Sequence, residues 1–156
     1  MIAKKGKKTL KILSKSEIEE IVRFVLKYFN CDSEFKIFFE EASQEEHFEM
    51  IKEILGISEI DHKFTEEHGK QWTQEDRKKV PIYLEIVLNK YKEPINFVIC
   101  IHPKGFSKGS PMAQRLAIIH EAKHIAEYPK TSKGDVSARD FEIMLLKEYL
   151  KAKQMH

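Results

Sequence analysis

The sequence predicts an α+β fold, in which helices pack on a small sheet, from two kinds of periodicity. Apolar residues recur at helical spacing in the stretches 16–29, 111–128 and about 135–153. Runs rich in branched and aromatic residues, typical of strands, occupy 35–39, 80–88 and 95–102. With one further helix predicted after the first strand, the elements follow the order α-β-α-β-β-α-α.

The first helix is marked at both ends. Ser16 can cap its N-terminus, with Glu19 completing a capping box, and Asn30 can end it. Its apolar face comprises Ile18, Ile21, Val22, Val25, Leu26 and Phe29. The strand that follows shows the alternation of Phe35, Ile37 and Phe39.

The middle of the chain predicts a helix, a loop and a hairpin. A second helix is expected over residues 43–55, with Gly56 just beyond its end. Residues 57–79 are polar and irregular, so His62 and His68 are expected mainly at a loop surface. The two apolar runs that follow, joined by a turn at 89–94, predict a β-hairpin, and a loop rich in Gly and Ser at 104–110 leads away from it.

Length and charge suggest one domain at residues 14–156, preceded by a basic N-terminal arm at residues 1–13. The net charge is only +2, which is too small for an overall nucleic-acid signature. The arm nevertheless carries Lys4, Lys5, Lys7, Lys8 and Lys11. Two interpretations remain open: a solvated terminus, or a weak contact with nucleic-acid phosphates.

No apolar run approaches the length of a membrane span, so no membrane partner is expected. The start, Met-Ile-Ala followed by lysines, lacks the apolar stretch of a secretory signal. Cys31 and Cys100 lie far apart and form no C-x-x-C pair, as in a reduced protein. Together these features predict a cytoplasmic protein.

The most informative stretch is His120-Glu121-Ala122-Lys123-His124, within a long and mostly apolar helix. Ser110 and Pro111 suit the start of that helix, and Pro129 lies beyond its end. Histidines four residues apart lie on one helical face, so both imidazoles can reach one metal ion. Polar groups in a buried helix need partners, which favours a metal site.

The chemistry of this H-E-x-x-H pattern is that of a zinc peptidase. His120 and His124 would be metal ligands, and Glu121, rotated about 100° around the helix, would be the general base for a zinc-bound water. Lys123 is unusual between the two histidines, and it is expected to pair with Glu127 on a solvent-facing strip.

Zinc needs a third protein ligand, and the last helix offers two candidates. Asp135 follows His124 by eleven positions, past a turn that can bring the chain back. Glu142 lies on the apolar face of the last helix, where a carboxylate needs a cation. Asp135 could instead be a helix cap, and Glu142 could pair with Arg139.

The pattern from His120 to Leu146 resembles the ImmA/IrrE-type zinc peptidases, in which H-E-x-x-H is followed by E-x-x-A-N-x-F-A-x-x-L-L. Ala138, Phe141, Leu145 and Leu146 match that pattern, whereas Asp135 replaces Glu, Arg139 replaces Asn and Glu142 replaces a small residue. In this register Asp135 takes the place of the glutamate ligand. Glu142 has a spacing similar to that of thermolysin-type enzymes.

The resemblance implies a zincin-like core, in which a small twisted, mostly antiparallel sheet packs with an active-site helix and a C-terminal helix. It also implies a zinc-dependent metallopeptidase that acts on a protein or peptide substrate, such as a regulatory protein. SprT-like peptidases have a similar layout and act on DNA-bound proteins, although their third ligand is usually His.

The expected mechanism needs two more parts. A peptide could bind along an exposed strand edge at residues 95–101, and Tyr128, Tyr149 or His102 could donate to the developing oxyanion. Two other classes of function remain open. One is a non-catalytic zincin-like regulatory binding domain. The other is a nucleic-acid-associated protein that uses its basic arm.

Overall fold

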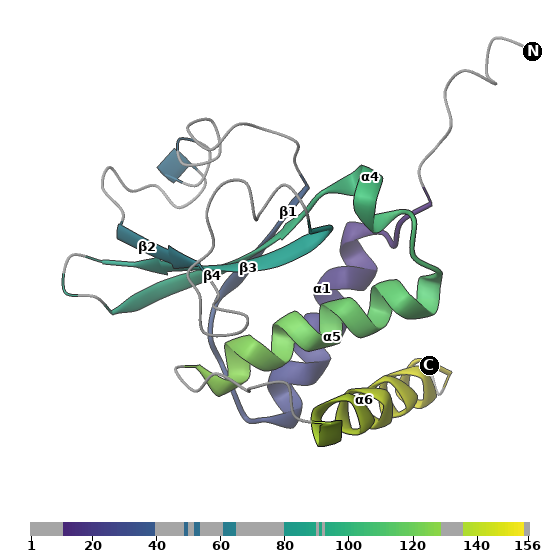
Figure 1. Ribbon diagram of the computed structural model, residues 1–156. Helices are drawn as coiled ribbons and strands as arrows, with labels where there is room; N and C mark the ends of the chain where they lie inside the picture. The colour runs from purple at the N-terminus through teal and green to yellow at the C-terminus, as the bar shows by residue number, and fades with distance from the viewer. Residues whose placement is uncertain are drawn as a thin grey trace, which may run out of the picture.

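The computed structural model describes residues 11–39, 49, 52–53, 61–64, 80–89, 91, 93–128 and 136–154, with the backbone alone at 61–64 and 136–138. Its elements are α1 (Lys15–Tyr28), β1 (Phe35–Phe39), β2 (Asp61–Phe64), β3 (Ile82–Leu88), β4 (Pro94–Ile101), α4 (Pro103–Phe106), α5 (Pro111–Glu127) and α6 (Val136–Gln154). The combination of helices with one small sheet confirms the predicted α+β class (Figure 1). In the described part of the chain, no helix has both the length and the apolar character of a membrane span.

The strands form one mixed sheet in the order β1-β4-β3-β2. β3 and β4 are the predicted antiparallel hairpin, and the side-chain oxygen of Asn89 closes its turn by accepting from the N–H groups of Tyr91 and Glu93. β1 runs parallel to β4, and β2 pairs antiparallel with the outer side of β3. Because β4 is hydrogen-bonded on both sides, the prediction of a free peptide-binding edge at residues 95–101 is wrong.

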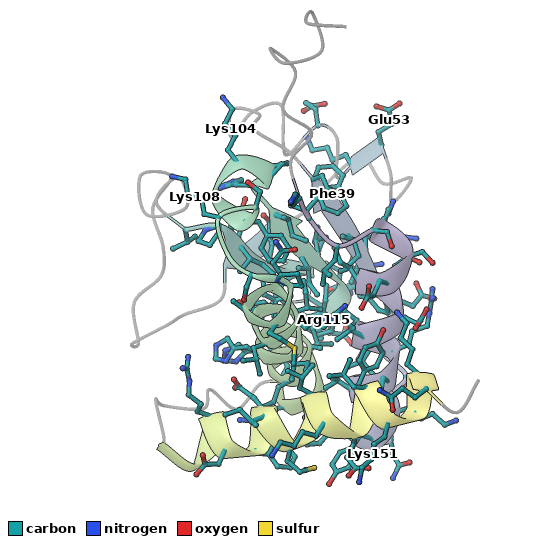
Figure 2. All side chains as sticks on the ribbon, turned by 90° about the vertical axis from the view of Figure 1, so that its right-hand side faces the viewer. Phe39, Glu53, Lys104, Lys108, Arg115 and Lys151 are labelled. Carbon is teal, nitrogen blue, oxygen red and sulfur yellow. The ribbon has the colours of Figure 1, made fainter. Side chains whose placement is uncertain are left out.

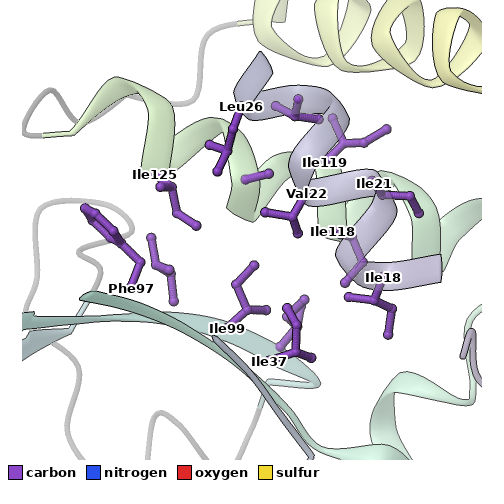
Figure 3. Close-up of a cluster of buried hydrophobic side chains, with 14 of the residues drawn as sticks. Ile18, Ile21, Val22, Leu26, Ile37, Phe97, Ile99, Ile118, Ile119 and Ile125 are labelled. Carbon is purple, nitrogen blue, oxygen red and sulfur yellow. The ribbon is translucent and has the colours of Figure 1, made fainter. Parts of the chain in front are cut away.

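The core lies between the sheet and the layer formed by α1 and α5 (Figure 3). Alternate residues of the hairpin enter this core, namely Ile82, Leu84, Ile86, Leu88, Phe97, Ile99 and Ile101. The intervening residues are buried as well, including Tyr83, Glu85, Val87, Val98 and Cys100. Both faces of the hairpin are removed from water, and its strands are mostly apolar, with Glu85 and Asn96 as buried polar exceptions.

Helix α5 begins and ends within one residue of its prediction. The Ser110 side chain accepts a hydrogen bond from the N–H of Ala113 at 3.1 Å, and Pro111 occupies the first turn. Its apolar face enters the core through Ile118, Ile119, Ala122 and Ile125. This burial fixes the rotation of α5 about its axis, and therefore the directions in which its polar residues point.

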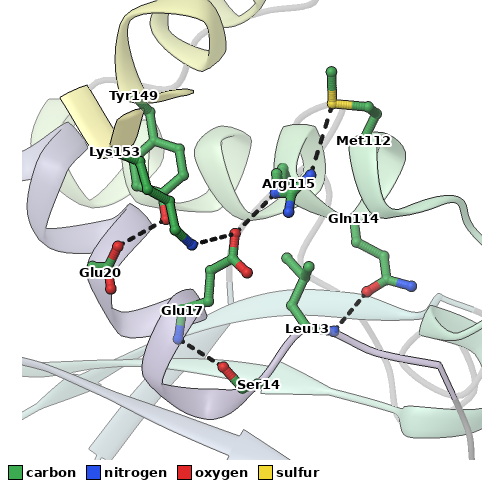
Figure 4. Close-up of polar contacts among 9 residues, drawn as sticks. All are labelled: Leu13, Ser14, Glu17, Glu20, Met112, Gln114, Arg115, Tyr149 and Lys153. Atoms are coloured by element: carbon green, nitrogen blue, oxygen red, sulfur yellow. Dashed lines mark hydrogen bonds and ion pairs between the residues drawn. The ribbon is translucent and has the colours of Figure 1, made fainter. Parts of the chain in front are cut away.

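A polar cluster holds α6 against α1 and α5 (Figure 4). Glu17 accepts a hydrogen bond from Nε of Arg115 at 2.9 Å and lies 3.5 Å from Nζ of Lys153. Burial opposes ionisation of Glu17, but the Arg115 hydrogen bond and the two positive charges outweigh it and lower the pKa of this carboxyl. The Tyr149 hydroxyl donates to Glu20 at 3.1 Å. Burial together with this bond raises the pKa of the Tyr149 hydroxyl.

Three local predictions differ from the structure. Helix α1 is capped by Ser14, whose side chain accepts from the N–H of Glu17 at 3.1 Å. The predicted pair is Ser16 with Glu19, but Ser14 and Glu17 have the same capping-box spacing. Strand β2 lies in a stretch predicted to be irregular, since its polar sequence gains strand structure only by pairing with β3. Helix α4 begins one residue before the predicted loop and continues into it.

The predicted helix at residues 43–55 lies mostly outside the described residues. Glu49, Lys52 and Glu53 are described there, and they have helical backbone. Cys31 and Cys100 are both free, in agreement with the prediction that they do not pair.

Candidate metal centre

The two histidines of α5 bring their Nε2 atoms together. Nε2 of His124 lies 3.0 Å from Nε2 of His120, and the two rings are nearly perpendicular, at 86°. Two imidazole nitrogens that share one tetrahedral zinc, each about 2.0–2.1 Å from it, lie about 3.3 Å apart. The spacing of the two nitrogens therefore suits a shared metal ion after a shift of a few tenths of an ångström.

Glu142 of α6 meets the other nitrogen of the His120 ring. Its Oε2 lies 2.9 Å from Nδ1 of His120. A carboxylate accepts from an N–H, so this contact favours the tautomer with the proton on Nδ1 and a lone pair on Nε2. That is the arrangement of a metal-binding histidine oriented by a neighbouring carboxylate. The contact also supplies the partner that Glu142, 7% exposed, needs.

A cavity of about 430 Å³ opens beside these side chains. One wall is formed where the chain enters β3, by Val80, Pro81 and Ile82. The other lining residues come from α5 (Ala113, Leu116, Ala117, His120 and Glu121) and α6 (Arg139 and Glu142). Glu121 is 3% exposed, yet it reaches this cavity. A general base must lie within reach of the reacting groups, so a role for Glu121 in hydrolysis would require a substrate to bind in this cavity.

The prediction that Lys123 lies on a solvent-facing strip is wrong. It is 6% exposed, its Nζ lies 5.8 Å from the centre of the Phe141 ring, and Glu127 is 3.9 Å away. Helix α6 packs against this side of α5, which could not be foreseen from the spacing of Lys123 and Glu127 alone.

The described side chains include no group that supplies a third metal ligand beside His120 and His124. Within the described ranges, no three His, Cys, Asp or Glu side chains are grouped as a metal ion requires. The predicted ligand Asp135 lies outside those ranges, immediately before the start of α6. The described residues thus fit zinc through two histidines and one supporting carboxylate.

The three candidate oxyanion donors lie elsewhere. Tyr149 donates to Glu20, and Nδ1 of His102 lies 2.9 Å from the carbonyl oxygen of Val80. Tyr128 packs against Phe97 and lines a separate cavity of about 300 Å³. None of the three lines the cavity beside His120.

Arg139 is the residue whose position at this cavity was not anticipated. The sequence offers Arg139 as an alternative partner for Glu142, whereas in the structure Glu142 contacts His120 and Arg139 lines the cavity. Arg139 and Glu142 are three residues apart, so both can lie on the face of α6 that borders the cavity. The spacing of three residues is the feature of the sequence that indicates a shared position for Arg139 and Glu142.

Searches against family models, curated proteins and solved structures return no match. The resemblance to ImmA/IrrE-type peptidases therefore remains a prediction based on the motif.

The contact between Glu142 and His120 predicts unequal roles for the two carboxylates of the C-terminal segment. Asp135→Ala should reduce zinc affinity severely, because a direct ligand is lost. Glu142→Ala should reduce it by about 10–100-fold, since the His120 ring loses its orientation. Competition titration against a chelator measures both. Glu148→Ala, an exposed carboxylate on α6, is the matched control. A larger loss in Glu142→Ala than in Asp135→Ala would make Glu142 the ligand.

Proposed function

We propose that the protein is a zinc-dependent metallopeptidase of zincin-like architecture that hydrolyses peptide bonds in a protein or peptide substrate. The observation that carries the proposal is the convergence of His120 and His124 at 3.0 Å, with Glu121 in the adjoining cavity wall. The free cysteines suit a cytoplasmic site of action.

His120, His124 and Asp135 would hold the metal, and Glu142 would orient His120. Bound zinc supplies a Lewis acid that polarises a carbonyl group and makes a bound water acidic. The Glu121 carboxylate accepts a proton from the attacking water and later delivers it to the nitrogen of the leaving amine. Its low exposure keeps bulk water from competing for that proton.

The cavity suggests how a substrate binds. The carbonyl oxygens of Val80 and Pro81 already interact with the ring and the N–H of His102, and Pro81 has no N–H. This wall therefore offers little for strand addition. On the opposite wall Ala113, Leu116 and Ala117 form a small apolar surface on α5. The substrate would be held there chiefly through its side chains.

Arg139 is suited to the negative charge that develops on the carbonyl oxygen. It lines the cavity together with His120 and Glu121, and its guanidinium is a fixed positive charge. A donor that meets this developing charge contributes strongly to the hydrolysis of acyl groups. Its replacement of the Asn in the ImmA/IrrE-type pattern would then be a functional difference.

Glu121→Gln should keep the fold and the metal but lose peptidase activity, because an amide cannot accept the proton. Zinc content and circular dichroism establish that the variant is intact, and cleavage of an unstructured protein substrate measures activity. Cleavage at the wild-type rate would refute the peptidase mechanism. If wild type and variant both bind zinc and neither cleaves, the non-catalytic regulatory domain becomes the better description.

Arg139→Ala should lower kcat by about 100-fold with little change in KM, because the charge that Arg139 meets appears only in the transition state. Arg139→Lys should restore part of the loss. Arg23→Ala, in which an exposed arginine of α1 is removed, controls for net charge. An unchanged kcat in Arg139→Ala would assign the developing charge to another donor.

A further inference from the structure

We infer that the protein has a binding surface for the phosphate backbone of nucleic acids, formed where the N-terminal segment meets the loop between α4 and α5. It comprises Lys11, Lys15, Lys104 and Lys108, which we call the basic surface. This inference is independent of the proposed peptidase activity, since none of these residues contacts the candidate metal centre.

The first observation is that both contributing stretches lack carboxylates. The first acidic residue of the chain is Glu17, and six lysines precede it. No Asp or Glu occurs between Glu93 and Glu121, a stretch that contains Lys104, Lys108 and Arg115. The chain has 25 acidic residues, yet these two long segments contain none. Their only charged side chains are therefore positive.

The second observation is that one side chain brings these segments together. Gln114 is 3% exposed, and its Oε1 accepts from the N–H of Leu13 at 2.9 Å (Figure 4). Its Nε2 donates to the carbonyl oxygens of Lys11 and Gly109, both at 2.9 Å. Because the carbonyl oxygens of Lys11 and Gly109 accept from the same Gln114 nitrogen, the backbone at Lys11 lies next to Gly109, which follows Lys108.

The lysines of the basic surface are available to a partner. Lys11, Lys15, Lys104 and Lys108 are all exposed. Figure 2 shows Lys104 and Lys108 at one end of the molecule and Lys151 of α6 at the other. Lys4, Lys5, Lys7 and Lys8 precede Lys11 in the sequence. Such a cluster matches the repeated charges of a phosphate backbone.

The described carboxylates in the first turns of α1 have other partners. Glu17 interacts with Arg115 and Lys153, and Glu20 accepts from Tyr149. Glu19 lies 3.5 Å from Arg23, one turn further along α1. None of these contacts of Glu17, Glu19 and Glu20 involves Lys11 or Lys15.

The composition of the basic surface favours nucleic acid over a membrane. Membrane-surface binding usually combines lysines with inserted aromatic or aliphatic side chains. Among the described residues, Phe106 of α4 is 3% exposed, and the exposed Met112 has its sulfur 3.9 Å from Nη1 of Arg115. Charge without apolar insertion suits sequence-independent phosphate contacts.

The test uses fluorescence anisotropy of short labelled DNA and RNA with the full-length protein between about 50 and 200 mM salt. Lys104→Ala/Lys108→Ala should weaken binding at the lowest salt by about tenfold and reduce the slope of log K against log salt by about 2. Lys147→Ala/Lys151→Ala removes the same charge from exposed positions on α6 and should leave both values unchanged.

Three results would overturn the inference. Wild-type protein that binds neither DNA nor RNA at the lowest salt lacks such a surface. Equal losses in the two double variants would indicate a general effect of net charge. Binding to vesicles of phosphatidylserine, without binding to either nucleic acid, would identify a membrane surface instead.

Discussion

The hydrogen bond between Glu142 and Nδ1 of His120 is the interaction on which the candidate site depends. It crosses from α6 to α5, satisfies a buried carboxylate and favours the tautomer of His120 that has its proton on Nδ1. Both helices are positioned independently of it. The core sets the rotation of α5, and the contacts of Glu17 with Arg115 and Lys153 hold α6 at its other end. The site therefore rests on long-range packing as well as on the motif.

Helix α5 also connects the two proposals. Gln114, which joins the halves of the basic surface, precedes His120 by six residues, or about 9 Å along the helix. The two proposed sites therefore share one helix, whose rotation is set by its burial in the core.

Most features encoded locally could be predicted from the sequence, although the N-cap of α1 is Ser14 and not the predicted Ser16. The caps of α5, the bounds of α6 and the hairpin of β3 and β4 follow from neighbouring residues, and the structure agrees with them. Features set by distant contacts could not. Strand β2 forms only against β3, β4 becomes an inner strand because β1 joins it, and Lys123 is buried because α6 packs nearby. The position of Arg139 at the cavity depends on the same packing of α6.

The most direct test is the metal content of the full-length protein purified without a histidine tag. Elemental analysis should find about one zinc per chain, with none in His120→Ala or His124→Ala. His102→Ala should retain the metal, since that ring interacts with the backbone at Val80. Protein that carries no metal, and takes up no zinc when it is added, would contradict the account.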